Sequence, residues 1–465
     1  MKFVLVFAIA IFTIVHTTNA AHHAVLIAGS HGYQNYRHHA DICHSYNILI
    51  KQGIPKSNII MMMYNDVANS WQNPFKGKLF NKPTDSNTPG VDVYANCKDN
   101  IDYEQRDVNA DNFIAVITGD KDKVQGGNGR VLNSTSTDRV FIYFADHGGT
   151  GLIAMPNPPY LHADDLNKAL KKMSDNQMFK ELTFYVEACE SGSMFEQYSD
   201  DLKKLNIYIT TAANPSESSW GTYCPPQDKV NGKDMHTCLG DLYSVNWMEN
   251  ADTADLKTET LQKQFEIVKN ETVKSHVQQY GTTDFTNEPC ANFEGDDDLN
   301  PLAVKAQQQL LLRKKKSSSS IEVTLIPRND ADEDMARTSA LAGMVDSRDI
   351  NIVRLFHKYM KTGKDAKELI KEIQSRESSN EIFKQLIVNL YGSNDENIAK
   401  KMYETHAYKP TKYDCHREII KIYNEQCPEQ FTDYSLKHTK VIVNLCEDLN
   451  GNVEKIGNAL RKVCQ

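Results

Sequence analysis

The sequence has no excess of positive charge and no cysteine or histidine spacing typical of a metal site. Its 52 lysines and arginines are outnumbered by 61 aspartates and glutamates, for a formal net charge of -9, which argues against general nucleic-acid binding. There is no C-x-x-C motif, and neither His22-His23 nor His38 belongs to a set with zinc spacing. We therefore expect no metal, no other cofactor and no nucleic-acid partner.

Long apolar runs are also missing, apart from one at the N-terminus. Residues 3–15 are apolar, follow the basic Lys2 and precede small residues at 18–20, which is the pattern of a cleaved signal peptide. This run is too short to span a bilayer comfortably, and no later segment is long and apolar enough. We interpret residues 1–20 as a signal peptide and expect a protein of the secretory pathway without a membrane anchor.

Cysteines and glycosylation motifs agree with an oxidising compartment. The chain has ten cysteines, which should be largely paired in such a compartment. Asn133 and Asn270 each begin an Asn-x-Ser/Thr motif, the acceptor for N-linked glycans. Such motifs also occur by chance, and they carry weight here because the signal peptide agrees with them.

Apolar runs rich in β-forming residues alternate with segments of helical periodicity. The apolar runs are 24–29, 59–64, 140–144, 182–186 and 207–213, and helical spacing is found in 38–51, 108–118 and 162–173. Strands alternating with helices predict an α/β fold with a mostly parallel sheet flanked by helices. The 465 residues, 40% hydrophobic and 24% charged, suit a globular protein of two or more domains.

The composition changes towards the C-terminus. Residues 292–340 contain EGDDD, RKKKSSSS and RNDADED in succession with little periodicity, which is typical of a linker. From about residue 349 onward, apolar residues recur at helical spacing, and four cysteines lie in this part. We predict an α/β domain over 21–291, a linker over 292–340 and an all-helical domain over 341–465 held by two disulfides.

Two neighbouring strands of the predicted sheet end in a histidine and a cysteine. His147 follows the run 140–144, and Cys189 follows the run 182–186. A cysteine attacks as its thiolate, and a nearby imidazole can accept the thiol proton and return it to a leaving amine. Gly148 leaves room for its own N–H and that of Cys189 to meet a developing oxyanion. Taken alone, Cys189 is equally consistent with a buried structural thiol, and His147 alone is better explained as a hydrogen-bonded surface histidine. Together they favour a catalytic pair.

Longer motifs surround this pair. They are GS-x-G-x-x-NYRH at 29–38, FADHGGTG at 144–151, YVEACESGSM at 185–194, TTAANPSESSWGTYC at 210–224 and LGDLYSVNWME at 239–249. With these motifs in this order the chain resembles the legumain family, the asparaginyl endopeptidases among the caspase-like cysteine proteases. The likeness continues more weakly through the helical tail. It implies a caspase-like fold and an endopeptidase that cleaves after asparagine, and after aspartate in acid, through a thioester on Cys189.

The resemblance also implies roles for individual residues. The nucleophile, its acid–base partner and the residue that positions the histidine are implied to be Cys189, His147 and Asn35. The pocket for the substrate side chain is implied to comprise Arg37, Glu187 and Asp241, lined by His38, Ser218 and Ser219. A substrate asparagine offers one carbonyl acceptor and two N–H donors, which suit one guanidinium and two carboxylates. The sequence departs from the family pattern at His31, Tyr33 and Gln34, so subsite preference is open there.

The family pattern implies three disulfides. They are Cys224–Cys238 around a hydrophilic loop, and Cys415–Cys446 and Cys427–Cys464 in the tail. For the four tail cysteines, the residues alone allow three connectivities. Cys43 lies on a predicted helix and is expected to be a buried free thiol. Cys97 and Cys290 are left over, and the sequence does not say whether they pair.

Members of this family are zymogens whose helical tail covers the active site and is released in acid. The resemblance therefore implies that the chain's own C-terminal domain is an inhibitor. It also implies peptide substrates with exposed asparagine, cystatin-type inhibitors as partners, and a location in the lysosome, in the vacuole or outside the cell. Asn329 in the linker resembles the self-processing site, although a chance Asn-Asp pair fits it equally. Two other functions stay open: an asparaginyl peptide ligase, in which an amine takes the thioester, and a non-catalytic binding protein.

Overall fold

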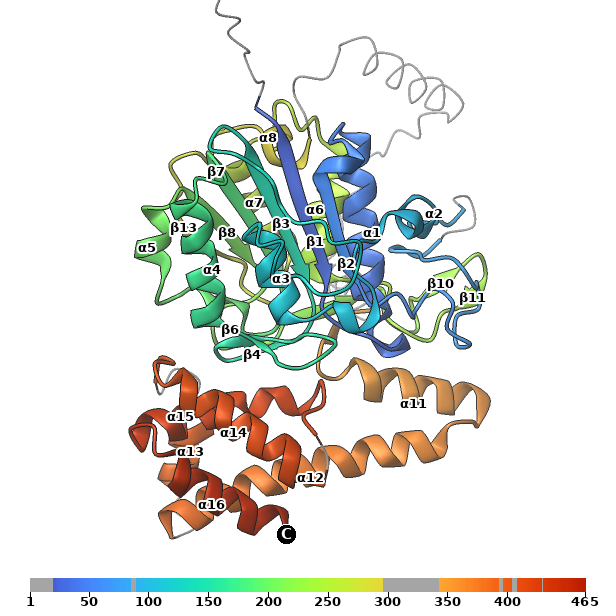
Figure 1. The fold of residues 1–465 in the computed structure, drawn as a ribbon. Coiled ribbons are helices and arrows are strands. Elements are labelled where there is room, and N and C mark those ends of the chain that lie inside the picture. The colour runs from blue at the N-terminus through green and yellow to red at the C-terminus, as the bar shows by residue number, and fades with distance from the viewer. Residues whose placement is uncertain (1–19, 85–88, 296–342, 393–395, 404–407, 429) are drawn as a thin grey trace, which may run out of the picture.

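The computed structural model describes residues 20–84, 89–295, 343–392, 396–403, 408–428 and 430–465. The described residues form an α/β unit followed by a helical tail, which lies along one end of the sheet near β4 and β6 (Figure 1). Asn329, nearly all of the predicted signal peptide and most of the predicted linker lie outside the described residues. At its start the linker differs from expectation, because Ala291–Glu294 is a short helix, α8.

A six-stranded sheet forms the centre of the α/β unit, in the order β13-β8-β7-β3-β1-β2. Its strands are β1 (His22–Ala28), β2 (Ile59–Met63), β3 (Arg139–Ala145), β7 (Glu181–Glu187), β8 (Ile207–Thr211) and β13 (Gln278–Gly281). The predicted apolar runs are the five strands that pair in parallel, which confirms the predicted α/β class. The antiparallel edge strand β13 was not predicted, because its sequence, QQYG, has no apolar run.

Helices cover both faces of the sheet, as a parallel sheet requires. Along β1, alternate side chains belong to two separate apolar cores. Ala24 and Leu26 share one core with α1 (Tyr36–Lys51), α6 (Leu242–Thr253) and α7 (Leu261–Glu271). Val25 and Ile27 share the other core with α3 (Ala110–Ile117), α4 (Ala163–Asp175) and α5 (Ser199–Lys203). Burial on both faces explains why these strands appear in the sequence as continuous apolar runs.

Smaller sheets surround the carboxyl ends of the parallel strands. One contains β4 (Gly148–Gly149), β5 (Leu152–Ile153) and β6 (Leu161–His162). A second contains β12 (Gly240–Asp241), β9 (Trp220–Thr222) and β14 (Val345–Asp346). β10 (Lys229–Val230) and β11 (Lys233–Asp234) form a hairpin. Because β14 belongs to the tail, the second sheet joins the two parts of the chain.

The tail is a bundle of helices with its own apolar core. Its helices are α11 (Ile350–Thr362), α12 (Ala366–Tyr391), α13 (Glu396–Tyr403), α14 (Tyr413–Gln426), α15 (Thr439–Asp448) and α16 (Val453–Cys464), with a 3-10 turn at Ser435–His438. Leu152 of β5 belongs to the same core, so the bundle packs directly on the α/β unit. Among the described residues, none of the helices is both long and apolar enough to cross a bilayer.

Four disulfides join cysteines of the described residues. Three are the pairs that the family pattern implied: Cys224–Cys238, Cys415–Cys446 and Cys427–Cys464. The fourth joins Cys43 to Cys97, so the expectation that Cys43 is a free thiol is wrong. Cys189 and Cys290 are free and buried.

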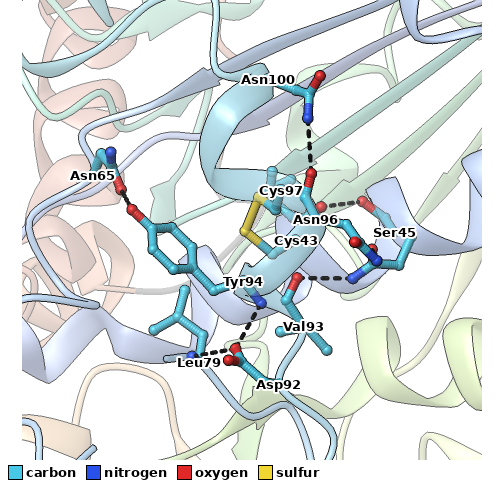
Figure 2. Close-up of a disulfide and its surroundings, with 12 residues drawn as sticks. Cys43, Ser45, Asn65, Leu79, Asp92, Val93, Tyr94, Asn96, Cys97 and Asn100 are labelled. Atoms are coloured by element: carbon cyan, nitrogen blue, oxygen red, sulfur yellow. Dashed lines mark hydrogen bonds between the residues drawn. A yellow bond between two sulfur atoms is a disulfide. The ribbon is translucent and has the colours of Figure 1, made fainter. Parts of the chain in front are cut away.

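The unexpected disulfide fastens α2 (Tyr94–Cys97) to α1 (Figure 2). Hydrogen bonds hold the chain around it: the Tyr94 hydroxyl donates to the Asn65 side chain at 2.7 Å, and the Asp92 carboxylate accepts from two backbone N–H groups. The polar segment before α3, which the sequence suggested would be long surface loops, is therefore attached to the helix that begins next to Asn35.

Candidate active site

The site forms where β3 and β7 end side by side. The two strands pair in parallel up to Ala145 opposite Glu187. The Asp146 N–H still donates to the Glu187 carbonyl at 3.0 Å. Beyond this point the chains continue into His147 and Cys189, so the two residues leave neighbouring strands at the same end of the sheet. This is the placement expected for ligand-binding and catalytic groups in a parallel sheet.

His147 is held by Asn35, the residue before α1. Its Nε2 lies 2.8 Å from the Asn35 Oδ1. The Asn35 amide nitrogen donates to the His31 carbonyl at 3.1 Å and to the Asp433 carboxylate at 3.2 Å, which fixes its oxygen towards the imidazole. Nε2 is therefore the nitrogen that carries hydrogen. Nδ1 is buried and has no hydrogen-bond partner among the described residues, so its lone pair is free to accept a proton.

The Cys189 thiol is buried at the other strand end. Its sulfur accepts from the Ser219 N–H at 3.3 Å. Gly148 approaches closely, since a Cβ at that position would overlap the carbonyl oxygen of Cys189. Burial raises the pKa of the Cys189 thiol to about 12, although the neighbouring Arg348 guanidinium acts in the opposite direction. In this form the thiol is protonated, and a protonated thiol is a poor nucleophile.

Three buried residues, Arg37, Glu187 and Asp241, cluster at the end of β7 that leads to Cys189. The Arg37 Nε donates to the Asp241 Oδ1 at 2.8 Å. The Glu187 Oε2 accepts from the backbone N–H and the hydroxyl of Ser244, at 3.1 and 2.9 Å. Each of these residues also has one buried atom without a hydrogen-bond partner among the described residues. These atoms are the Arg37 Nη2, the Glu187 Oε1 and the Asp241 Oδ2. Buried polar groups normally find partners, so this arrangement suits a polar ligand.

Electrostatics in the pocket follow from its burial. Burial, together with the nearby Asp241, holds the pKa of Glu187 well above its usual range. His38 lies between two carboxylates, with Nδ1 3.5 Å from Asp146 and Nε2 3.4 Å from Asp241. Burial and the Arg37 guanidinium nevertheless hold the pKa of His38 well below its usual range. The predicted lining residue Ser218 does not contact these groups, and its hydroxyl accepts from Arg348 at 3.2 Å.

The start of the tail lies in this site as an extended strand. β14 pairs with β9 in antiparallel register, with Val345 opposite Gly221. The pairing continues to Ser347, whose N–H donates to the Ser219 carbonyl at 3.0 Å and whose hydroxyl lies 3.2 Å from the Ser219 hydroxyl. Ser219 thus contacts both the Cys189 sulfur and Ser347. Strand addition of this kind is a common way to bind an extended peptide.

Two further tail residues contact the proposed catalytic groups. The Arg348 guanidinium forms a two-point ion pair with Glu190 and donates to the Gly148 carbonyl at 3.2 Å. The Asp433 carboxylate lies 3.4 Å from the His147 Nε2. Although burial opposes it, the interactions with His147 and its neighbours hold the pKa of Asp433 far below its usual range. The tail therefore places a cation on the cysteine side of the site and an anion on the histidine side.

These tail contacts were not predicted from the sequence. Glu190 adjoins Cys189, yet its partner Arg348 is 158 residues away, and no local motif links them. Ser347 and Asp433 lie outside the apolar helical pattern that defined the tail. Adjacency to the predicted nucleophile is the one signal that could have marked Glu190 for attention.

Models of protein families match the chain in two segments. The Peptidase C13 family matches residues 22–296, which includes every residue of the site outside the tail. The legumain prodomain matches residues 367–464, which corresponds to the bundle from α12 to α16.

Curated relatives match over most of the chain. The vacuolar-processing enzyme of Glycine max is 36% identical, over 91% of this chain and 81% of its own length. The legumain of Rattus norvegicus is 36% identical, over 95% of this chain and 92% of its own length. The legumain of Canavalia ensiformis is 35% identical, over 93% of this chain and 86% of its own length. Among solved structures, caspase-1 from Spodoptera frugiperda aligns with 60% of this chain and 94% of its own, at a TM-score of 0.34 and 9% identity. That overlap is too low to support an argument, so the fold class rests on strand order and pairing.

Proposed function

The chain belongs to the Peptidase C13 family and is a cysteine endopeptidase with a legumain-type prodomain, and we propose that it cleaves peptide bonds after asparagine. The observation that supports this specificity is the convergence of unpartnered atoms from Arg37, Glu187 and Asp241 beside Cys189. An asparagine amide supplies one acceptor for the guanidinium and two donors for the carboxyl oxygens. An apolar side chain would leave these atoms buried and unpaired, so the pocket rejects it.

Aspartate differs from asparagine in charge rather than in shape. An ionised aspartate would bring a further negative charge next to the Asp241 carboxylate, while the Arg37 guanidinium is already paired with Asp241. Like charges in a buried site repel strongly. A protonated aspartic acid lacks this charge and presents a carbonyl and an O–H. Cleavage after aspartate is therefore restricted to acid.

The proposed reaction uses the two strand ends. The His147 Nδ1 takes the proton of the Cys189 thiol, and the thiolate sulfur forms a bond to the substrate carbonyl carbon. Backbone N–H groups of Gly148 and Cys189 stabilise the oxyanion. The C–N bond then breaks, the imidazolium returns its proton to the leaving amine, and a thioester remains. Attack by water, with His147 again accepting a proton, releases the acid and restores the thiol.

Acid activation is the second part of the proposal. The tail is held to the catalytic unit by charge pairs, including Arg348 with Glu190 and Arg417 with Asp164 and Asp165. Protonating such carboxylates removes the attraction, so docking weakens as pH falls. Processing after Asn329, in the chain between the two parts, would then make release permanent. Residues 345–348 have to leave the site before a substrate can enter.

The remaining expectations concern the location of the protein. Asn133 and Asn270 are both exposed on the α/β unit, where a glycan would not disturb the core. With the N-terminal signal pattern and four disulfides, this supports a secretory route to a lysosome, a vacuole or the exterior. Cystatin-type inhibitors are proposed as partners on the family resemblance alone.

A peptide panel tests the specificity and the nucleophile together. Peptides that differ only in one central residue (Asn, Asp, Gln or Leu) are incubated with the acid-processed protein and analysed by mass spectrometry. We expect cleavage after Asn throughout the active range, after Asp only at the acidic end, and none after Leu. Cys189→Ala should abolish cleavage, whereas Cys290→Ala, which removes the other free thiol, should retain it. Cleavage that ignores the central residue, or that survives Cys189→Ala, would contradict the proposal.

A further inference from the structure

Three buried side chains with metal-binding atoms meet at the end of the sheet. His38 comes from α1, and Asp146 and His147 follow β3. Their exposed fractions are 0%, 2% and 3%, and one potential ligand atom of each lies within 4.8 Å of the others. The His38 Nδ1 and the Asp146 Oδ1 are 3.5 Å apart. The sequence analysis expected no metal site, because His38 is far from Asp146 and His147 along the chain.

In both imidazoles, the Nε2 atom has a side-chain oxygen near it. The His38 Nε2 lies 3.4 Å from the Asp241 Oδ2, and the His147 Nε2 lies 2.8 Å from the Asn35 Oδ1. Histidines that bind metals usually donate their other N–H to such an oxygen, which fixes the tautomer and orients the ring. The His38 Nδ1 is left on the side of Asp146, and the His147 Nδ1 is buried without a hydrogen-bond partner among the described residues. The Ser30 hydroxyl lies 2.6 Å from the His38 Nδ1 and can rotate away, since hydroxyl orientation is adjustable.

Asp146 supplies the third and most informative observation. Both of its carboxylate oxygens are buried and lack a hydrogen-bond partner among the described residues. A buried carboxylate in this state is costly unless a cation or a donor satisfies it. Asp146 and His147 also line a cavity of about 890 Å³ between the catalytic unit and the tail, through which a hydrated ion can reach them.

We propose that His38, Asp146 and His147 bind a Zn²⁺ ion, with water from the cavity in the fourth position. Two imidazoles and one carboxylate are a ligand set that suits zinc and other late transition metals rather than Mg²⁺ or Ca²⁺. Zinc bonds of about 2.0–2.2 Å place tetrahedral ligands about 3.4 Å apart, which is the separation of the first two atoms. The three ligand atoms lie within 4.8 Å of one another, so their separations close by at most about 1.4 Å as the side chains adjust on binding.

The bound ion inhibits the enzyme, because it occupies the nitrogen that accepts the thiol proton. This consequence depends on the proposed role of His147 in catalysis, whereas binding itself does not. Cys189 is not a ligand in this arrangement. The proposed site therefore differs from one in which the catalytic thiolate itself binds the zinc ion.

Binding is measured with Co²⁺, which takes zinc sites and absorbs visible light in tetrahedral coordination. Full-length Cys189→Ala at neutral pH is titrated with Co²⁺, and Zn²⁺ is then added to displace it. We expect one equivalent with visible absorption, displacement by Zn²⁺ and a higher melting temperature with metal present. In this background Asp146→Asn and His38→Gln should each weaken binding at least tenfold, since even changes around metal ligands cost 10- to 100-fold. Asp111→Asn is the matched control, because Asp111 lines the same cavity and does not belong to the group of three ligands.

Several results would overturn the proposal. One is unchanged Co²⁺ affinity in both ligand variants while each melts, without metal, at the temperature of the Asp111→Asn control. Another is stoichiometric binding to the wild type that disappears in Cys189→Ala, which would make the thiolate the ligand. For inhibition, Zn²⁺ is added to the processed wild type, and half-inhibition is expected near the dissociation constant of Cys189→Ala. Full peptidase activity at saturating Zn²⁺ would refute the inhibitory role and leave the binding result to stand separately. A processed protein without any activity would instead contradict the proposed function.

Discussion

Replacing Ser347 by asparagine should turn the blocking strand into a substrate. Ser347 pairs with Ser219, which also contacts the Cys189 sulfur. Residues 345–347 therefore occupy the positions of a substrate strand that ends at the nucleophile. The Ser347 hydroxyl lies 3.2 Å from the Ser219 hydroxyl. The atoms Arg37 Nη2, Glu187 Oε1 and Asp241 Oδ2 stay without a hydrogen-bond partner among the described residues. The wild-type strand thus occupies the cleft without filling the pocket.

The size of the effect follows from those unpartnered atoms. Arg37, Glu187 and Asp241 each offer one, and a hydrogen bond to a charged group contributes about 1.5–3 kcal/mol. If an introduced asparagine forms two such bonds and loses about 1.5 kcal/mol on ordering, the strand binds about 1.5–4.5 kcal/mol more tightly. In the Cys189→Ala background, Ser347→Asn should therefore raise the melting temperature at neutral pH by several degrees.

With the nucleophile present, the same substitution should create a cleavage site. We expect acid incubation of Ser347→Asn to give a new fragment that begins at Arg348, identified by intact mass and N-terminal sequencing. Ser347→Leu introduces a side chain of about the size of asparagine that is apolar. It should give no such fragment, because it leaves the pocket atoms unpaired. The reasoning is refuted if Ser347→Asn matures like the wild type, with no cut before Arg348 and no gain in stability. Equal cleavage of the leucine variant would refute it as well.

Three further predictions concern release of the tail in acid. Release is measured by size-exclusion chromatography at stepped pH, on protein whose linker has been cleaved. The ring centroids of His162 and His416 lie 5.1 Å apart across the interface, with Arg417 and Asp164 beside them. Burial lowers the pKa of His162 to about 3, so docking loses stability as pH falls from about 6.5 towards 3. His416→Leu should therefore shift release of the tail to lower pH. Arg417→Gln should weaken docking by about 1 kcal/mol, because its ion pairs are partly exposed, and should shift release to higher pH. Asp433→Asn should also favour release, by about 1 kcal/mol because the Asp433 side chain is 39% exposed. The charge that it removes persists in acid, since the interactions with His147 and Asn35 hold the pKa of Asp433 far below its usual range. A release midpoint that none of the three variants moves would contradict this account of docking.

The sequence predicted the sheet and the pairing of the two proposed catalytic residues for a physical reason. Strands buried on both faces must be apolar throughout, so each parallel strand appeared as an uninterrupted run that ended where polar residues began. His147 and Cys189 follow two such runs. Parallel strands end at one edge of a sheet, so proximity of the two residues followed from the topology. The polar edge strand β13 offered no such signal.

Contacts between distant segments could not be predicted in this way. Cys43 lies on the buried side of a helix, where a free thiol is a reasonable expectation. Its partner Cys97 comes from a polar segment 54 residues later, and composition does not say which helix such a segment covers. The same limit applies to Arg348 and Glu190. Such pairs depend on where a loop or tail docks, which is a property of the whole surface.

Latency in this protein has a steric and an electrostatic component, and both come from the same tail. The strand at 345–347 fills the cleft, so a substrate cannot pair with β9. Burial raises the pKa of the Cys189 thiol to about 12, so the sulfur stays protonated at physiological pH. Departure of the tail would remove the strand and admit water to the thiol, and it would also remove the Arg348 guanidinium, which lowers the thiol pKa. Because burial is the larger of the two causes, we expect the pKa of Cys189 to fall on release. One release step therefore opens the cleft and makes the nucleophile available, and neither change requires the sheet to move.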